Sequence, residues 1–201
     1  VSSMDHKRAL DHDEGLNTGG MGTVAPNPYY TPAVAERCMQ EIFLPTVAAM
    51  QAEGCPFKGC LYFGLMLTPD GPKVIEYNCR FGDPETQVVL PLLESDLLTV
   101  MEATTNGTLD KTDVKFSDGA AACVILASGG YPLAYEKGKE ITGLTAGQLD
   151  AADVTVYHAG TAIKDGRLVT NGGRVLGVTA TANTLPEALK KAYAATESIH
   201  F

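Results

Sequence analysis

The most informative stretch of the chain, residues 74–85, reads Val-Ile-Glu-Tyr-Asn-Cys-Arg-Phe-Gly-Asp-Pro-Glu. Apolar and polar residues alternate over its first half, which predicts a β-strand that ends near Asn78. Its last part, Asp83-Pro84-Glu85, has a carboxylate in a cap position followed by a proline, which predicts the start of a helix. The stretch therefore indicates a strand followed closely by a helix.

Two oxygen-bearing side chains of this strand are candidates for a metal site. Glu76 and Asn78 are two residues apart, so they share one face while the residues between and beside them point to the other. A carboxylate and an amide oxygen suit Mg²⁺, which completes its coordination with water and phosphate. Arg80 follows and can hold a carboxylate or a phosphate in two places. Taken alone, the pair could equally be a solvated face, and the arginine an ion-pair partner of Asp83.

The elements before this stretch follow from turn and cap signals. Apolar runs at 60–67 and 73–78 flank Thr-Pro-Asp-Gly-Pro, which predicts a β-hairpin. Thr31 and Pro32 predict a helix start, and the helix should run over 33–52 with a kink at Pro45. Residues 5–28 are polar and rich in glycine, fit neither period, and are predicted to form an ordered loop.

The region after this stretch changes from helical to strand-rich. Ser95 is predicted to cap a helix that ends near Asn106 and Gly107. Strands are then predicted over 120–127, 154–161, 163–170 with a turn at 165–166, and 174–181, and a last amphipathic helix begins at Thr184. We place a domain boundary near Asp113, which gives domains 1–112 and 113–201.

Three further segments have candidate binding residues. Asn17 to Gly22 could expose successive backbone N–H groups to an anion, because glycine allows positive φ and close approach; an ordinary surface turn explains it as well. Lys7 and Arg8 add positive charge or form a solvated pair. Residues 171–174, Asn-Gly-Gly-Arg, could equally be a tight hairpin with an exposed arginine.

The composition excludes several classes of partner. The 201 residues have a net charge of −9, so no overall attraction to nucleic acid or to an anionic membrane is expected. No apolar run reaches the length of about 20 residues that a spanning helix needs. The five cysteines form no C-x-x-C pair and are predicted to be reduced thiols. We therefore expect a soluble, cytoplasmic protein.

The complete string Glu-Tyr-Asn-Cys-Arg-Phe-Gly-Asp-Pro-Glu-Thr-Gln, residues 76–87, closely resembles the metal-binding segment of phosphoribosylamine–glycine ligases in the ATP-grasp superfamily. Residues 5–8 (Asp-His-Lys-Arg) and 17–22 (Asn-Thr-Gly-Gly-Met-Gly) resemble the substrate-side loop of that family. Residues 129–132, 158–161 and 170–175 are also similar to it, so the resemblance covers essentially the whole chain.

This resemblance implies an α/β (α+β) fold. Residues 1–112 would be the C-terminal part of an ATP-grasp catalytic domain, with a mainly antiparallel sheet flanked by helices. Residues 113–201 would form a smaller β-rich domain with a terminal helix. Because the chain opens at Val1 inside a substrate-loop motif, we expect a piece of a ligase that lacks its N-terminal half and ATP lid and is inactive alone.

The resemblance also implies an activity. The glycine carboxylate would attack the γ-phosphate of ATP to give glycyl phosphate, and the amine of phosphoribosylamine would then displace phosphate. Mg²⁺ or Mn²⁺ would bind to Glu76 and Asn78, and Arg80 would be catalytic. The implied substrate-binding residues are Lys7, Arg8, Asn17, Thr18, Gly19, Gly20, Asn171, Gly172 and Arg174. The alternatives are another ATP-grasp carboxylate–amine ligase and a noncatalytic module that completes a site with a partner chain.

Overall fold

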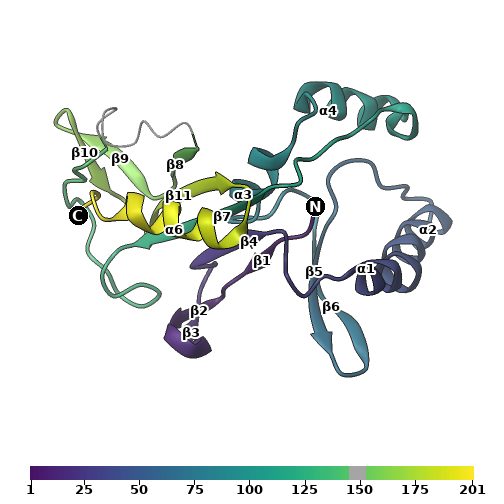
Figure 1. Cartoon of the computed structure of the whole chain (residues 1–201), viewed down its shortest axis with the longest axis horizontal. Coiled ribbons are helices and arrows are strands. Elements are labelled where there is room, and N and C mark those ends of the chain that lie inside the picture. Colours follow the sequence, from purple (N-terminus) through teal and green to yellow (C-terminus); the bar gives the residue numbers. More distant parts are fainter. Residues whose placement is uncertain (145–152) are drawn as a thin grey trace. The chain divides into compact units, whose positions relative to one another are not determined.

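The computed structural model describes residues 1–144 and 153–201, which form two compact units (Figure 1). The first unit comprises Val1–Asn27, Asp83–Leu92 and Ser117–Phe201, and the second comprises Pro28–Gly82 and Leu93–Phe116. We expected two contiguous domains, 1–112 and 113–201. The units differ from them because β4 (Gly22–Ala25) pairs with β7 (Ala120–Ala127), which brings the first residues of the chain into the sheet of the last.

The first unit is built on a five-stranded sheet with the order β1-β4-β7-β11-β8. All its strand pairs are antiparallel, which agrees with the expected fold class. The remaining strands are β1 (Met4–Asp5), β8 (Val154–His158) and β11 (Arg174–Ala182), so the strands predicted near 120, 154 and 174 are confirmed.

The predicted loop over 5–28 is wrong, because most of this segment is extended. It contains part of β1, then β2 (Arg8–Leu10), β3 (Glu14–Asn17) and β4, with a 3-10 turn at Asp11–Asp13 between β2 and β3. These strands have at most four residues each, and β4 is held by a partner about 100 residues away. Such short strands leave no period that can be recognised locally.

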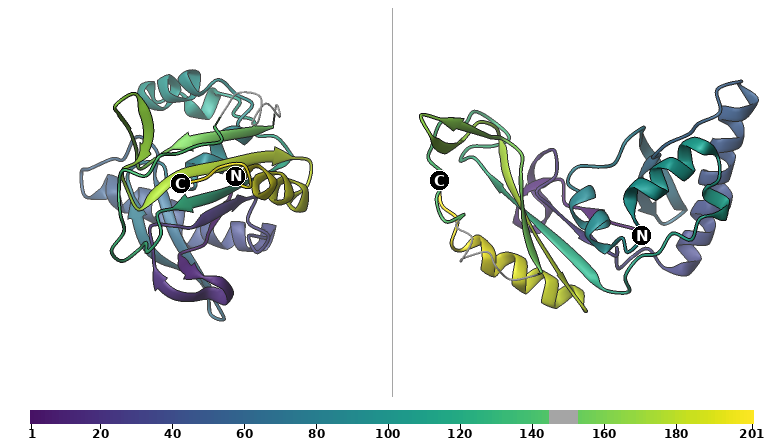
Figure 2. Two further views of the ribbon diagram at one scale, coloured as in Figure 1. Left: turned by 90° about the vertical axis from the view of Figure 1, so that its left-hand side faces the viewer. Right: turned by 90° about the horizontal axis from the view of Figure 1, so that it is seen from above.

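Helix α6 (Leu185–Thr196) lies along one face of this sheet (Figure 2). Ala188 and Ala192 of the helix are fully buried, and Ala188 packs in a cluster with Val24 and Ala122 of the sheet. The small side chains on both surfaces allow the helix to approach the strands closely. The predicted terminal helix is confirmed.

A hairpin of β9 (Thr161–Lys164) and β10 (Arg167–Thr170) follows β8. Asp165 and Gly166 connect the strands, and both have positive φ, 52° and 76°. Positive φ at both central residues is typical of the tight turns that suit the twist of a hairpin, so this predicted turn is confirmed.

The second unit begins with a helix that has a π-helical interruption. It consists of α1 (Pro32–Cys38), a π-helical stretch (Met39–Phe43) and α2 (Leu44–Ala52). The Thr31 hydroxyl accepts a hydrogen bond from Val34 N at 3.3 Å, as expected for an N-cap. Pro45 has no N–H to continue the α-helical ladder, and the wider turn directly precedes it. The predicted helix is confirmed with an irregularity at Met39–Phe43, whereas the kink at Pro45 stays a prediction.

The predicted hairpin of the second unit is also present, as β5 (Tyr62–Thr68) and β6 (Gly71–Asn78). Arg37 of α1 connects the helix to the hairpin turn, because its Nη2 donates to the Asp70 carbonyl at 3.3 Å. The same guanidinium pairs with Glu41 at 2.8 Å. The turn is therefore held from outside as well as by its own residues.

Helix α4 (Leu97–Asn106) of the second unit begins one residue later than predicted. Its N-cap is Asp96, whose Oδ1 accepts from Thr99 N at 2.7 Å. Ser95 was predicted as the cap, but its hydroxyl instead donates to the Asp113 carbonyl and accepts from Lys115 N. Two adjacent residues of cap-forming type cannot be distinguished by local sequence. The helix ends at Gly107 with a φ of 70°, as predicted.

The helix predicted at residues 83–85 is short and is not capped by Asp83. It consists of α3 (Thr86–Val89) and a 3-10 turn, Leu90–Leu92, and its N-cap position is Glu85 without a side-chain cap. The Asp83 carboxylate accepts from Gln87 Nε2 at 3.0 Å instead. The prediction of a helix start is confirmed, whereas the role given to Asp83 is wrong.

Candidate active site

Glu76 and Asn78 lie on the same side of β6. In the antiparallel pair, Glu76 is opposite Gly64 and Asn78 is opposite Tyr62. The register is irregular before Glu76, where Ile75 is the extra residue, and regular from Glu76 onward. Because the two positions are separated by one residue in regular pairing, their oxygen atoms point to a common side.

Gly64 makes room for the Glu76 side chain and was not predicted. A Cβ at Gly64 would lie 2.7 Å from Glu76 Cγ, which is too close for two carbon atoms. The absence of a side chain at Gly64 therefore allows the Cβ–Cγ part of the Glu76 side chain to lie against the neighbouring strand. The available signal was a glycine inside an otherwise apolar strand, which often marks a close approach.

Arg80 follows the end of β6 and is exposed. Its Nη1 donates to the carbonyl of Phe81 at 2.9 Å, which uses one of the five N–H donors of the guanidinium. The ion pair of Asp83 is made with Arg174, at 3.3 Å. The alternative in which Arg80 serves as the ion-pair partner of Asp83 therefore has no support.

The donor set at Glu76 and Asn78 fits magnesium better than a transition metal. The described residues contain no group of three or more His, Cys, Asp or Glu side chains that could hold a metal ion. A structural zinc site needs four such ligands, whereas magnesium is often bound through one or two protein oxygens plus water and phosphate. The assignment of a metal to this pair stays a prediction.

The glycine-rich loop after β3 uses its amides within the chain. Thr18 N donates to the Lys7 carbonyl at 2.7 Å, Gly20 N donates to the Thr18 hydroxyl at 3.0 Å, and Met21 N donates to the His6 carbonyl at 2.8 Å. We expected successive amides exposed to an anion, and for these three that expectation is wrong. The Lys7 and His6 carbonyls come from the preceding strand segment, whereas the Thr18 hydroxyl is a partner within the loop itself.

Gly19 in this loop is held by two side chains of the strand-rich region. Its N–H donates to Tyr131 Oη at 2.9 Å, and its carbonyl accepts from Arg174 Nη1 at 2.8 Å. Arg174 Nη1 also lies 3.2 Å from the Asp83 carbonyl, and the Arg174 side chain is only 22% exposed. Gly19 and Arg174, both predicted to bind substrate, are thus brought together, and Tyr131 is an additional residue that the prediction did not include.

The other predicted residues near the loop have different surroundings. Lys7 pairs with Asp5 at 2.5 Å, and the Asp5 side chain is 6% exposed. Burial raises the pKa of the Asp5 carboxyl, against the opposing effect of the Lys7 ammonium. Arg8 Nη1 donates to the Gly15 carbonyl at 2.7 Å, and Asn17, opposite Arg8 in the hairpin, is exposed.

Asn171 and Gly172 form the turn before β11. Asn171 N donates to the Gly160 carbonyl at 2.6 Å, and the Gly172 carbonyl accepts from the Ser128 hydroxyl at 2.7 Å. Their backbones thus link two other loops of the first unit. Nothing in these contacts separates a substrate-binding role from a structural one, so their assignment stays a prediction.

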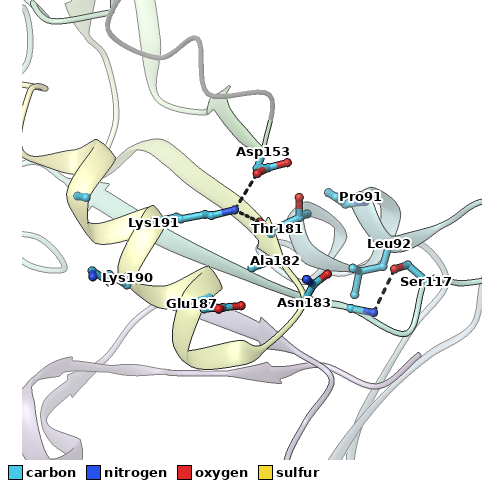
Figure 3. Close-up of a pocket in the computed structure, with 12 residues that line it drawn as sticks. Pro91, Leu92, Ser117, Asp153, Thr181, Ala182, Asn183, Glu187, Lys190 and Lys191 are labelled. Atoms are coloured by element: carbon cyan, nitrogen blue, oxygen red, sulfur yellow. Dashed lines mark hydrogen bonds and ion pairs between the residues drawn. The ribbon is translucent and has the colours of Figure 1, made fainter.

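A hollow of about 700 Å³ lies elsewhere on the first unit, beside α6 and the end of β11 (Figure 3). The Lys191 side chain lines it, and its Nζ donates to Asp153 Oδ2 at 2.7 Å and to the Thr181 carbonyl at 3.3 Å. None of the predicted site residues lines this hollow.

Comparisons with known proteins identify the family of the chain. Residues 1–86 match a family model described as phosphoribosylglycinamide synthetase, ATP-grasp (A) domain, and residues 121–201 match the phosphoribosylglycinamide synthetase C domain. The fold and the first of these family models therefore define a chain of the ATP-grasp class. More particularly, the chain belongs to the phosphoribosylamine–glycine ligase (phosphoribosylglycinamide synthetase) family.

Individual relatives support this membership over the whole chain. It is 48% identical to the phosphoribosylamine–glycine ligase of Caldanaerobacter subterraneus and 50% identical to that of Agrobacterium fabrum, covering 100% of this chain and 47% of each relative. The crystal structure of the Thermotoga maritima phosphoribosylamine–glycine ligase superposes with a TM-score of 0.85 at 41% identity, over 99% of this chain and 48% of that one. The chain thus spans about half the length of the relatives it matches.

Proposed function

We propose that this chain is part of a cytoplasmic phosphoribosylamine–glycine ligase, which joins glycine to 5-phosphoribosylamine and converts ATP to ADP and phosphate. The product would be glycinamide ribonucleotide, an intermediate of purine synthesis. The other part of the active enzyme would correspond to the remaining half of the relatives' length. Family membership supports the reaction, and five free cysteines agree with a reducing compartment.

One observation carries the assignment of the site. Glu76 and Asn78 lie on a common side of β6, with Gly64 opposite Glu76 and Arg80 just beyond the strand. Two hard oxygen donors and a guanidinium are the groups that a nucleotide-dependent ligase needs around transferring phosphate oxygens. When bound there, Mg²⁺ or Mn²⁺ would offset the charge of the ATP phosphates.

The reaction needs no nucleophile from the protein. The glycine carboxylate oxygen would attack the γ-phosphorus of ATP and release ADP, and the nitrogen of phosphoribosylamine would then attack the acyl carbon and release phosphate. The protein would contribute alignment of the two substrates and stabilisation of developing negative charge. Arg80, which is exposed and has Nη1 bonded to the Phe81 carbonyl, is suited to hold the carboxylate and then the acyl phosphate.

The test is Glu76→Gln in the intact enzyme, assayed for ADP release with both substrates over a range of Mg²⁺ concentrations. The amide keeps the shape of the side chain and removes its charge. We expect the apparent affinity for Mg²⁺ to fall by about 10- to 100-fold or more, since even partners of metal ligands have effects of that size. Turnover close to that of the unchanged enzyme at limiting Mg²⁺ would remove Glu76 from the metal site.

Tyr77→Phe is the matched control, because Tyr77 is the next residue of the same strand and points to the other side. Its hydroxyl lies 3.4 Å from Thr46 Oγ1, and the edge of its ring contacts Phe63. We expect its Mg²⁺ dependence to equal that of the unchanged enzyme. A loss in both variants would indicate damage to the hairpin and not the loss of a ligand.

A further inference from the structure

The Gly19 peptide is exposed, yet both of its polar groups are bonded to side chains far away in sequence. The N–H is bonded to Tyr131 and the carbonyl to Arg174, which are 112 and 155 residues away. An exposed peptide can bond to water at little cost, so its own stability does not require these partners. The two contacts restrain the two peptide units on either side of the Gly19 Cα, one through Tyr131 and the other through Arg174.

Tyr131 is itself held in one orientation. Its N–H donates to the Ser128 carbonyl at 3.0 Å, and its ring meets the edge of the Tyr135 ring at 6.2 Å. The ring lies directly over Gly173, where a Cβ would overlap it. The hydroxyl is therefore presented to Gly19 by a ring that has little freedom to rotate away.

Arg174 contacts Gly19 through the Gly19 carbonyl. Its guanidinium covers Gly19 so closely that a Cβ there would lie 3.1 Å from Cζ and Nε. Its Nη1 is also 3.3 Å from Asp83 Oδ1, which places the arginine between the loop and the start of α3. Nη1 of Arg174 is thus engaged by the loop and by Asp83.

From this geometry we infer that Tyr131 is a positioning residue, whose hydroxyl fixes the Gly19 peptide and so sets the conformation of the glycine-rich loop, residues 17–20, for binding glycine or phosphoribosylamine. The inference rests on the proposed function for the identity of the substrates. Its structural part, the restraint of the loop by the phenol, stands independently of it. Tyr131 acts through the loop and does not itself touch the reacting atoms.

The first test measures the loop directly. Tyr131→Phe in the intact enzyme keeps the ring that packs over Gly173 and removes only the acceptor of the Gly19 N–H. Residue-resolved hydrogen exchange at Gly19 is expected to become about 2- to 10-fold faster, since a hydrogen bond of this kind contributes about 0.5–1.5 kcal/mol. The control is Tyr135→Phe, which removes the neighbouring hydroxyl and should leave that exchange unchanged. An unchanged rate in Tyr131→Phe overturns the inference.

The second test connects the loop to catalysis. We expect Tyr131→Phe to raise the KM for glycine or phosphoribosylamine several-fold while the KM for ATP and the Mg²⁺ dependence stay as in Tyr135→Phe. A merely structural role of Tyr131 would lower the amount of folded enzyme and leave every KM unchanged. That result overturns the positioning role, and so does faster hydrogen exchange at Gly19 without any change in KM. If the unchanged enzyme does not use these substrates, the proposed function fails, whereas the exchange rate still decides whether Tyr131 restrains the loop.

Discussion

Gly20 is required to be glycine for two separate reasons. Its φ is 111°, a conformation that residues with a Cβ rarely adopt. A Cβ would also lie 2.6 Å from Asp5 Oδ1 and 2.6 Å from Pro84 Cδ. The buried Asp5 carboxylate and the Pro84 ring are held in place, so neither can move away cheaply.

Gly20→Ala is therefore expected to lower the free energy of unfolding by about 2 kcal/mol or more, from backbone strain and overpacking together. Gly129→Ala is the matched control, because its φ is not in the left-handed region and a Cβ there has nothing within 4 Å. That control should change stability by less than about 1 kcal/mol. Urea denaturation of both variants measures the difference, and equal midpoints would contradict the strain at Gly20.

At the residue level, sequence predicted what depends on near neighbours. The common side of Glu76 and Asn78 follows from strand alternation, which needs no knowledge of the rest of the fold. The Gly19 contact with Tyr131 and the Asp83 contact with Arg174 could not be predicted, because these partners are 112 and 91 residues apart. Only the folded chain brings them together.

At the level of elements, the success of prediction follows the strength of local signals. The hairpin turn at Asp165 and Gly166 and the cap at Thr31 are determined within a few residues, and both were predicted. β2, β3 and β4 were missed because their pairing partners, and not their own residues, keep them extended. The long-range pairing of β4 with β7 also explains why the compact units do not follow the expected domain boundary.

The contact between α6 and the sheet depends on small side chains. Ala188 is fully buried against Ala122 and Val24, so a larger side chain has no space without a shift of the helix. Ala188→Leu is expected to destabilise the first unit by about 1–3 kcal/mol through overpacking. Ala194→Leu places the same substitution on the exposed side of the helix and should change stability by about 0.5 kcal/mol or less. Thermal unfolding followed by circular dichroism compares them, and similar losses in both would contradict the close packing.

For the whole molecule, charge limits what this chain can bind alone. It has 24 acidic and 15 basic residues, a net charge of −9, whereas ATP is a polyanion. A generally negative field opposes its approach unless basic groups or magnesium are concentrated at the site. The described residues also include no helix long and apolar enough to cross a membrane. Under the proposed function, nucleotide binding would therefore depend on local groups, of which Glu76, Asn78 and Arg80 would be only a part.

Because the relatives are about twice as long as this chain, we expect the rest of the nucleotide site to come from the remaining half of the enzyme. Isothermal titration of the 201-residue chain with Mg–ATP should give a Kd weaker than about 1 mM, less than about 4 kcal/mol of binding free energy. The same titration with a chain extended to the full length of the relatives should show clearly tighter binding, which Glu76→Gln weakens. The short and the extended chain both carry the acidic charge of this half, so the gain in affinity would come from the contacts that the added half makes with the nucleotide. Equal affinity for the short and the extended chain would instead place the complete nucleotide site within these 201 residues.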